Sequence, residues 1–195
     1  MLYLGIEGEV DAAHHTIYFS NSYVQNIENI SKHHTLPEDP SFYLENPGVT
    51  DKSMAPKGMS SLYLLVPVPH MHPNINWVQE TMKFREIAYK QLERIGLGQL
   101  QDRVVFEKIF TPSDWQSQME IYKGATFSLA HNLLQMLNFR PNNRFKELEG
   151  VYLVGGGTHP GSGLPVIYSS ARISCGLLCD DFGVPFNSEP AFTSV

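Results

Sequence analysis

The sequence predicts an α+β fold, with a mixed or antiparallel sheet covered by helices. Short runs rich in apolar residues are typical of strands, and the clearest of them lie at 15–19, 60–66 and 104–110. Elsewhere apolar residues recur at helical spacing, which predicts amphipathic helices at 22–31, 77–95 and 112–121. Of 195 residues, 42% are hydrophobic and 17% are charged. This composition supports a folded core and excludes a wholly disordered chain.

The first third of the chain predicts further short strands. Residues 2–6 form an apolar run, interrupted only by glycine, that reads as a strand with no preceding segment to pair with. Prolines between residues 35 and 60 break helices and predict loops, in which 41–44 form another short strand. The run 60–66 is almost continuously apolar, which predicts a strand that is buried on both faces.

Capping residues define the helices of the middle of the chain. Asn76 is a favourable N-cap for the helix at 77–95, and Gly96 ends it. Thr111 followed by Pro112 and, at the third helical position, Asp114 predicts the start of the next helix. The strongly apolar segment 127–138 is expected to be helical or loosely helical.

A glycine-rich turn is the most informative segment. Residues 151–154 read as a short strand, 155–163 have the sequence GGGTHPGSG, and 166–179 read as a helix. Glycines let a backbone approach a ligand closely, and a helix N-terminus favours an electron-rich or anionic group. Pro160 stands where a dinucleotide fingerprint needs its third glycine, and no Gly-Lys-Ser/Thr of a P-loop follows. A tight turn that only packs is the alternative on this pattern alone.

Several segments together resemble one family. GVYLVGGGTHPGSGLPVIYSSAR resembles the C-terminal flavin-contacting motif of the bacterial and fungal phytoene desaturases, which are FAD-dependent carotenoid desaturases. Other segments resemble the same family in the same order: LYLG, HHTIYF, LPEDPSFY, TDKSMAP, LYLLVPVP, TPSDW, GATFSLAHNLLQM and FRPNNR. The resemblance covers nearly the whole chain up to about Asp181. Agreement of several ordered motifs is far more specific than one glycine loop.

The resemblance implies an oxidoreductase that acts on CH–CH bonds of a long carotenoid polyene by hydride transfer to FAD. It implies contacts to the flavin ring from Gly156, Gly157, Thr158 and His159, and a helix start near the ring at Leu164, Pro165 and Val166. The candidate walls of the substrate tunnel are Phe127, Leu129, Leu133, Leu134, Met136, Leu137 and Phe139. Each of these could instead belong to ordinary core or subunit packing. No residue is assigned as catalytic, because His159 fits a general acid or base and also a turn residue that contacts flavin.

The resemblance also divides the chain. It implies a substrate-binding region at 1–150, the strand-turn-helix of an FAD-binding domain at 151–181, and a loose tail at 182–195. Family members carry a G-x-G-x-x-G fingerprint for the ADP half of FAD, and this sequence lacks it. We therefore expect a C-terminal portion with an incomplete FAD-binding domain, no desaturase activity alone, and an N-terminal half that another chain could supply. The alternative is a non-catalytic remnant or apolar-ligand-binding module without cofactor.

Charge and composition narrow the partners and the location. A formal net charge of −6 gives no basic face for nucleic acid. A lipid-like substrate makes peripheral membrane contact an expectation, and missing strands predict exposed apolar surface. Cys175 and Cys179 are expected to be buried or half-buried free thiols, which fits a reducing, cytoplasmic setting.

The eight histidines raise a metal site as a further hypothesis. His14 and His15 are adjacent, and adjacent side chains on a strand point to opposite faces. His70 and His72 lie in a loop between prolines, and no metalloprotease-like spacing occurs. The sequence therefore predicts no metal ligand, and a metal-dependent hydrolase is the weakest of the readings.

Overall fold

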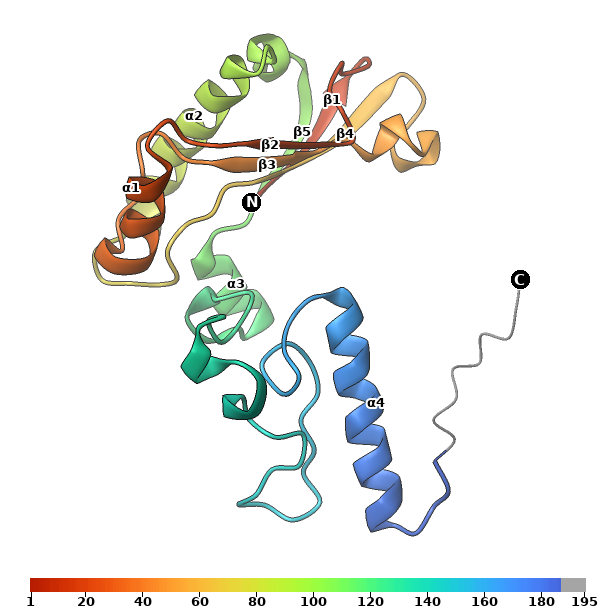
Figure 1. Ribbon diagram of the computed structural model, residues 1–195. Helices are drawn as coiled ribbons and strands as arrows, with labels where there is room; N and C mark the ends of the chain where they lie inside the picture. Colours follow the sequence, from red (N-terminus) through yellow and green to blue (C-terminus); the bar gives the residue numbers. More distant parts are fainter. Residues whose placement is uncertain (187–195) are drawn as a thin grey trace. The chain divides into compact units, whose positions relative to one another are not determined.

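The computed structural model describes residues 1–186; residues 187–195, part of the predicted tail, lie outside the described residues. The chain divides into two compact units, Met1–Ala125 and the residues from Thr126 onward. In Figure 1 the first unit runs from red to green and the second from teal to blue. The functional boundary after residue 150 stays a prediction.

The first unit is built on a five-stranded sheet in which every pair of neighbouring strands is antiparallel. The strand order is β2-β3-β4-β1-β5. The strands are β1 (Leu2–Glu7), β2 (His15–Tyr18), β3 (Phe42–Glu45), β4 (Met59–Leu65) and β5 (Val104–Ile109). The predicted α+β class is confirmed, and the sheet takes the antiparallel one of the two expected forms.

Strand β1 lies inside the sheet, with β4 on one side and β5 on the other. The strand predicted at residues 2–6 is confirmed, and both of its partners come from later in the chain. Close approach to β5 needs the glycine in β1. A Cβ added at Gly5 would lie 3.1 Å from the Cβ of Phe106, next to an irregularity in the register.

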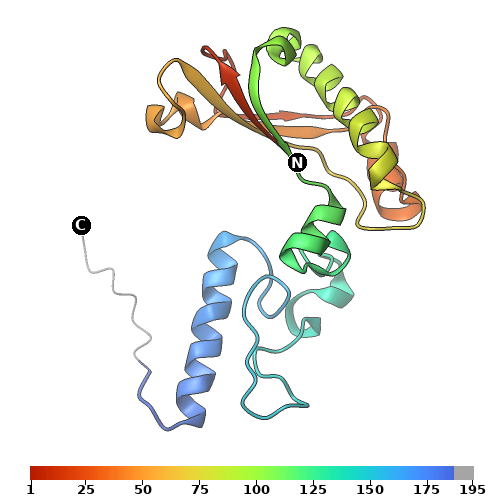
Figure 2. The same ribbon diagram turned by 180° about the vertical axis from the view of Figure 1, so that it is seen from behind.

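The hydrophobic core lies between one face of the sheet and helix α2 (Trp77–Arg94). Figures 1 and 2, seen from opposite sides, both show α2 lying along this face. Buried and half-buried residues alternate along β4, so its predicted burial on both faces is wrong. The reason is that alternate side chains of a strand point to opposite faces, and α2 packs on one of them. Core residues include Leu2, Leu4, Ile6, Phe42, Leu44, Leu62, Leu64, Phe84, Ala88 and Leu92.

Aromatic side chains from neighbouring strands meet on the face opposite this core. The ring of Tyr63 lies 5.2 Å from that of Tyr3 and 6.3 Å from that of Tyr43, between centroids. Desolvation and, secondly, the neighbouring Tyr3 raise the pKa of Tyr63 to about 12. This face therefore holds Tyr63 in its neutral form well into the alkaline range.

The remaining helices of the first unit are short. Helix α1 (Tyr23–Glu28) continues into a π-helical turn (Asn29–His33), and α3 covers Pro112–Met119. The predicted cap of α3 is confirmed, because Thr111 and Asp114 each accept a hydrogen bond from the backbone N–H of the other. Single 3₁₀ segments lie at Pro47–Val49, Lys52–Met54, Gly98–Arg103 and Tyr122–Gly124.

The second unit contains one long helix, α4 (Leu164–Asp181), which confirms and extends the predicted helix at 166–179. The predicted helix at 127–138 reduces to short 3₁₀ turns at Leu133–Gln135 and Leu137–Phe139. A short apolar segment is marginal as a helix unless it packs one face against a partner. On α4 both cysteines are free, but Cys175 is exposed rather than buried as expected.

Helix α2 offers two side chains that separate core packing from helix propensity. Leu92 is fully buried and Met82 is 59% exposed on the same helix. We expect Leu92→Ala to lower the free energy of unfolding by about 2–5 kcal/mol, because it leaves a cavity. Met82→Ala should change it by less than about 1 kcal/mol. Urea unfolding of both variants measures this, and equal losses would contradict the assigned core.

The pKa of Tyr63 predicts a difference in alkaline stability. Its folded-state value of about 12 exceeds the ordinary value of 10.0. The associated stability is therefore complete below about pH 10 and is lost as the pH rises toward 12. Tyr63→Phe should reduce the loss of stability over this interval, whereas the 81% exposed Tyr122 provides the control Tyr122→Phe. Unfolding midpoints test this expectation. They are measured from about pH 9 to about pH 12, an interval that includes the ordinary tyrosine pKa.

Candidate functional site

The glycine-rich turn at 155–163 leads directly into α4, as the sequence predicts. The strand predicted at 151–154 is wrong: its only pairing among the described residues is an isolated bridge between Tyr152 and Arg144. A strand needs a neighbour along its length to satisfy its backbone. In this unit side chains of α4 take over part of that role.

A buried amide connects the segment before the turn to α4. The Nδ2 of Asn143 lies 3.2 Å from the Leu153 carbonyl oxygen, 3.1 Å from Ser170 Oγ and 3.2 Å from Ser174 Oγ. Ser174 donates its hydroxyl to the same Leu153 carbonyl, and Ser170 Oγ accepts from the Gly155 N–H. Asn143, Ser170 and Ser174 are all at most 3% exposed. This polar network fixes where the turn begins.

The far end of α4 is fixed by a second set of polar contacts. Asp181 accepts hydrogen bonds from the Tyr152 hydroxyl at 2.5 Å and from Arg144 Nη2 at 2.7 Å. The Tyr152 hydrogen bond and then the Arg144 charge lower the pKa of Asp181. Since Arg144 and Tyr152 also form the isolated bridge, this contact aligns α4 with the chain before the turn.

The turn is held from inside by one carbonyl group. The Pro141 oxygen accepts the Thr158 hydroxyl at 2.6 Å and the His159 N–H at 2.9 Å. Thr158 is buried, whereas His159, Gly156 and Gly157 are half-buried. A Cβ at Gly157 would lie 3.4 Å from Ser128 Cβ. The four predicted residues follow one another in this turn, and Thr158 shapes it through its hydrogen bond to the Pro141 carbonyl.

The start of α4 differs in detail from a row of free amides. Gly163 caps the helix with φ +108°, a conformation that favours glycine. Pro165 has no N–H, and the Val166 N–H is bonded to the Gly163 carbonyl at 2.9 Å. The N–H of Leu164, the first helical residue, has no partner within the helix. Leu164 and Pro165 are exposed, so this donor lies at the surface of the described unit.

Arg140 is a buried cation beside the turn, and sequence reasoning did not single it out. It is 2% exposed, and its guanidinium donates to the Gln135 carbonyl at 2.9 Å and the Leu129 carbonyl at 3.5 Å. Its Nε lies 3.6 Å from where a Cβ of Gly161 would be. No ion pair among the described residues includes Arg140. The motif FRPNNR contains Arg140 and Asn143, so their place in the sequence was visible but their burial was not.

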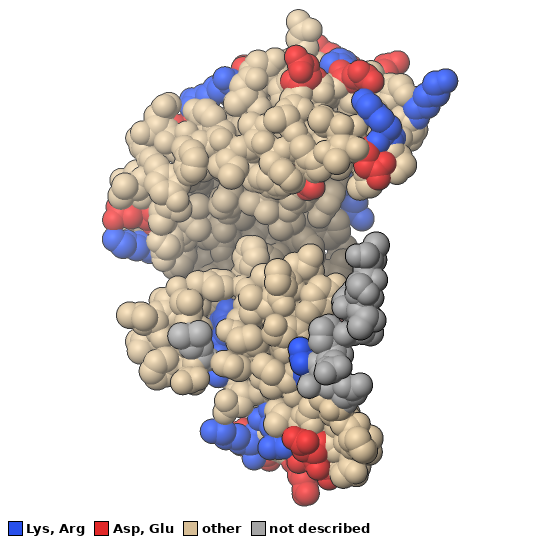
Figure 3. Space-filling model, turned by 45° about the vertical axis from the view of Figure 1, so that its right-hand side comes forward, with Lys and Arg blue, Asp and Glu red and all other residues tan. Residues whose placement is uncertain are grey.

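The predicted polyene-contacting segment presents apolar side chains to solvent in the second unit. Phe127 is 64% exposed, Leu133 86%, Leu134 77% and Phe139 69%. Leu129 and Met136 are half-buried, and the side chain of Leu137 lies outside the described residues. On the face that Figure 3 shows, much of the surface of this unit is neither acidic nor basic. Several of these side chains are therefore at the surface of the part of the unit that the structure describes.

Two polar side chains, an exposed histidine and a half-buried serine, connect this segment to the turn. His131 Nε2 is hydrogen-bonded to the hydroxyl of Ser162. His131 lies between the apolar residues of the segment, and Ser162 lies just before the cap of α4. Sequence reasoning assigned neither residue, because their separation along the chain hides the contact.

Comparisons with known proteins give the following results. No protein-family model matches the chain. It is 49% identical over 187 residues to a 4,4'-diapophytoene desaturase (4,4'-diapolycopene-forming) of Methylomonas sp, covering 95% of this chain and 37% of that protein. It is 42% identical to a phytoene desaturase (lycopene-forming) of Pantoea ananas, with 93% and 37% covered. An all-trans-zeta-carotene desaturase of Myxococcus xanthus is 40% identical, with 94% and 35% covered.

The chain is much shorter than the relatives that it matches. It spans little more than a third of the length of the curated relatives that it matches. The match extends over nearly all of this chain, so both units take part in it. Among the described residues, no helix combines the length and apolar character needed to cross a membrane.

The Asn143 network predicts a local stability effect. Asn143→Leu removes the amide and leaves the Leu153 carbonyl and two serine hydroxyls to find other partners. We expect a loss of about 1–3 kcal/mol, seen as faster hydrogen exchange in 153–174. Asn132 is exposed and makes no side-chain cap, so Asn132→Leu is the matched control. Unchanged exchange in Asn143→Leu would show that the network does not hold α4.

Proposed function

Since this chain belongs, over the stretch that it covers, to the carotenoid desaturase family, we propose that it forms part of an FAD-dependent oxidoreductase acting on a long polyene. The observation that carries the proposal is the glycine-rich turn, which leads into a helix start beside the buried Arg140. The proposed reaction removes two hydrogens from adjacent carbons and extends conjugation. When bound, FAD supplies the acceptor for the hydride.

The residues of the turn fit a flat, electron-rich ring. Gly156 and Gly157 lack side chains, so their backbone can approach a ring closely. The exposed Leu164 N–H at the helix start is a donor with positive potential behind it. We assign flavin contacts to Gly156, Gly157, His159 and Leu164. Thr158 supports the turn through Pro141, and Pro165 and Val166 position the helix start rather than donating an N–H.

Arg140 supports the cofactor proposal independently of the glycines. Among the described residues, the buried guanidinium of Arg140 donates to carbonyl oxygens and forms no ion pair with a carboxylate. Burying an unpaired charge is costly, so such a group favours an anionic partner. A ring that gains negative charge on reduction provides one, and preorganised positive charge stabilises it. We therefore propose that Arg140 strengthens binding of the reduced cofactor.

The apolar segment fits the other half of the reaction. Phe127, Leu133, Leu134 and Phe139 present apolar side chains that favour contact with a hydrocarbon. We propose that these residues, with Leu129, Met136 and Leu137, contact the polyene. Their job would be to hold one CH–CH bond against the ring and to exclude water. Exposed apolar side chains of this kind also support peripheral contact with a membrane that contains the substrate.

Flavin retention tests the proposal. The chain is expressed alone and together with the part of the Methylomonas relative that it does not span, and the purified material is examined for flavin absorbance. We expect flavin in the co-expressed material. Gly157→Val should lower the flavin content about tenfold or more, which corresponds to ~1.4 kcal/mol of binding free energy. Gly48→Val, at a glycine of the first unit where an added Cβ would make an ordinary contact with Asn46 Oδ1 at 3.7 Å, is the matched control.

The charge variants separate the role of Arg140 from folding. Arg140→Met should lower the affinity for reduced flavin more than Arg140→Lys, because lysine keeps the charge.

If the co-expressed wild-type material holds no flavin, the cofactor assignment is wrong and the non-catalytic apolar-ligand module is favoured. If Gly157→Val and the wild type retain flavin equally, the glycine turn is not the contact.

A further inference from the structure

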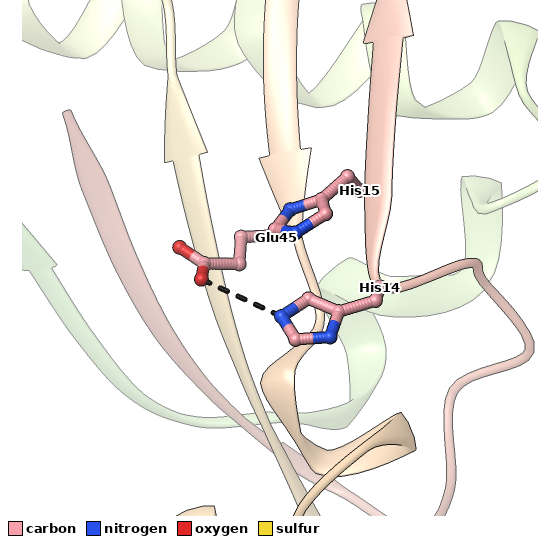
Figure 4. Close-up of side chains that lie close together, drawn as sticks. All are labelled: His14, His15 and Glu45. Carbon is pink, nitrogen blue, oxygen red and sulfur yellow. Dashed lines mark ion pairs between the residues drawn. The ribbon is translucent and has the colours of Figure 1, made fainter. Parts of the chain in front are cut away.

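Two histidines and a glutamate meet at the edge of the sheet in the first unit. His14 immediately precedes β2, His15 is its first residue, and Glu45 is the last residue of β3. His15 and Glu45 lie directly opposite each other in the antiparallel register. One ligand atom from each of the three side chains lies within 4.8 Å of the other two. Figure 4 shows the three side chains pointing toward one another, with an ion pair between His14 and Glu45.

The prediction that His14 and His15 point to opposite faces fails at this position. His14 stands in a bend before the strand, so strand alternation does not apply to it. The two imidazole rings lie 4.1 Å apart between centroids, at an angle of 31°. The Asn46 N–H donates to the His14 carbonyl at 2.8 Å and holds this bend beside β3. The fold therefore gathers two nitrogen ligands from consecutive residues.

Hydroxyl groups orient both imidazole rings. His14 Nδ1 lies 2.5 Å from Thr50 Oγ1, and His15 Nδ1 lies 2.7 Å from the Tyr43 hydroxyl. A hydroxyl oxygen that accepts from Nδ1–H leaves the lone pair on Nε2. His14 Nε2 lies 3.7 Å from Glu45 Oε1, so this ring nitrogen faces the carboxylate. Orientation of a ligating histidine through its second nitrogen is the usual arrangement in metal sites.

We propose that His14, His15 and Glu45 bind a divalent transition-metal ion of the zinc type. Two imidazole nitrogens and one carboxylate oxygen suit zinc, cobalt or nickel, whereas magnesium and calcium prefer sites made of oxygen ligands alone. The side chains of His14 and Glu45 are 30% and 34% exposed, so water has access to complete the coordination. Three protein ligands would leave the fourth position of a tetrahedral site to a water molecule. Binding would link β2 to β3 at the edge of the sheet.

A second histidine cluster provides an internal comparison. The rings of His34 and His72 stack 4.3 Å apart, and His70 lies 5.1 Å from His34, between centroids. The backbone already engages two of these rings, because His70 Nδ1 contacts the Met71 carbonyl and His72 Nδ1 accepts the Asn74 N–H. These three residues lack a carboxylate among them. The pairing of donors with an acidic ligand thus favours the His14 cluster.

Zinc titration of the purified chain, followed by calorimetry, tests the proposal. We expect one zinc per chain at this site, with affinity lowered about tenfold or more in His14→Ala, His15→Ala and Glu45→Gln. His70→Ala should leave the affinity unchanged. Thr50→Val, which removes only the hydroxyl partner of His14, should weaken binding about 10–100-fold. Equal binding by wild type, His14→Ala and His15→Ala would overturn the site, as would a loss confined to His70→Ala.

A spectroscopic measurement on the unmodified chain does not depend on the folding of any variant. Zinc X-ray absorption should show two imidazole ligands and additional oxygen ligands at about 2.0–2.2 Å. A first shell with fewer than two imidazoles, or with sulfur from Cys175 or Cys179, would overturn the proposal. This readout is independent of flavin, so it stands whether or not the desaturase proposal holds.

Discussion

Hydrogen bonding of β1 on both of its sides is the constraint on which the first unit depends. The strand joins β4, and through it β3 and β2, to β5 on the other side. Its alternate residues Leu2, Leu4 and Ile6 are buried beneath α2. Removing this strand would expose the edges of two separate sheet segments, and unpaired edges are costly and prone to association. The positions of β4 and β5 follow directly from this pairing.

Alternation along the strands gives the same sheet two different faces. The core face carries leucine, isoleucine and phenylalanine and closes against α2. The other face carries tyrosines, and at the β2–β3 edge it carries His15 and Glu45. A polar or ligating side chain can be kept there because water reaches it, so its desolvation cost stays small. One face of the sheet therefore holds the hydrophobic core, and the opposite face holds His15 and Glu45.

The second unit depends on side-chain hydrogen bonds where the first depends on a strand ladder. Asn143 binds the chain before the glycine turn to Ser170 and Ser174, and Asp181 does so at the other end of α4. Small residues at these positions let the backbone lie close to the helix. Arg140 adds a buried positive charge beside the turn. Together they place a helix start, glycine backbone and a cation in one short stretch of structure, which is the chemistry that the flavin proposal uses.

Local pattern by itself determined the strands at 15–19, 60–66 and 104–110, the helices at 77–95 and 166–179, and the cap at Thr111, because capping and side-chain periodicity act over a few residues. Ordered motifs also determined the relationship to carotenoid desaturases. Only the tertiary structure decided that β1 pairs on both of its sides, that β4 is buried on one face, that residues 127–138 do not form a helix, and that Arg140 is buried. It also brought His14 and His15 to Glu45, which lies opposite His15 in the strand register although the two are far apart along the chain. Pairing partners and burial depend on contacts between distant segments, and a sequence pattern carries no record of which segments meet.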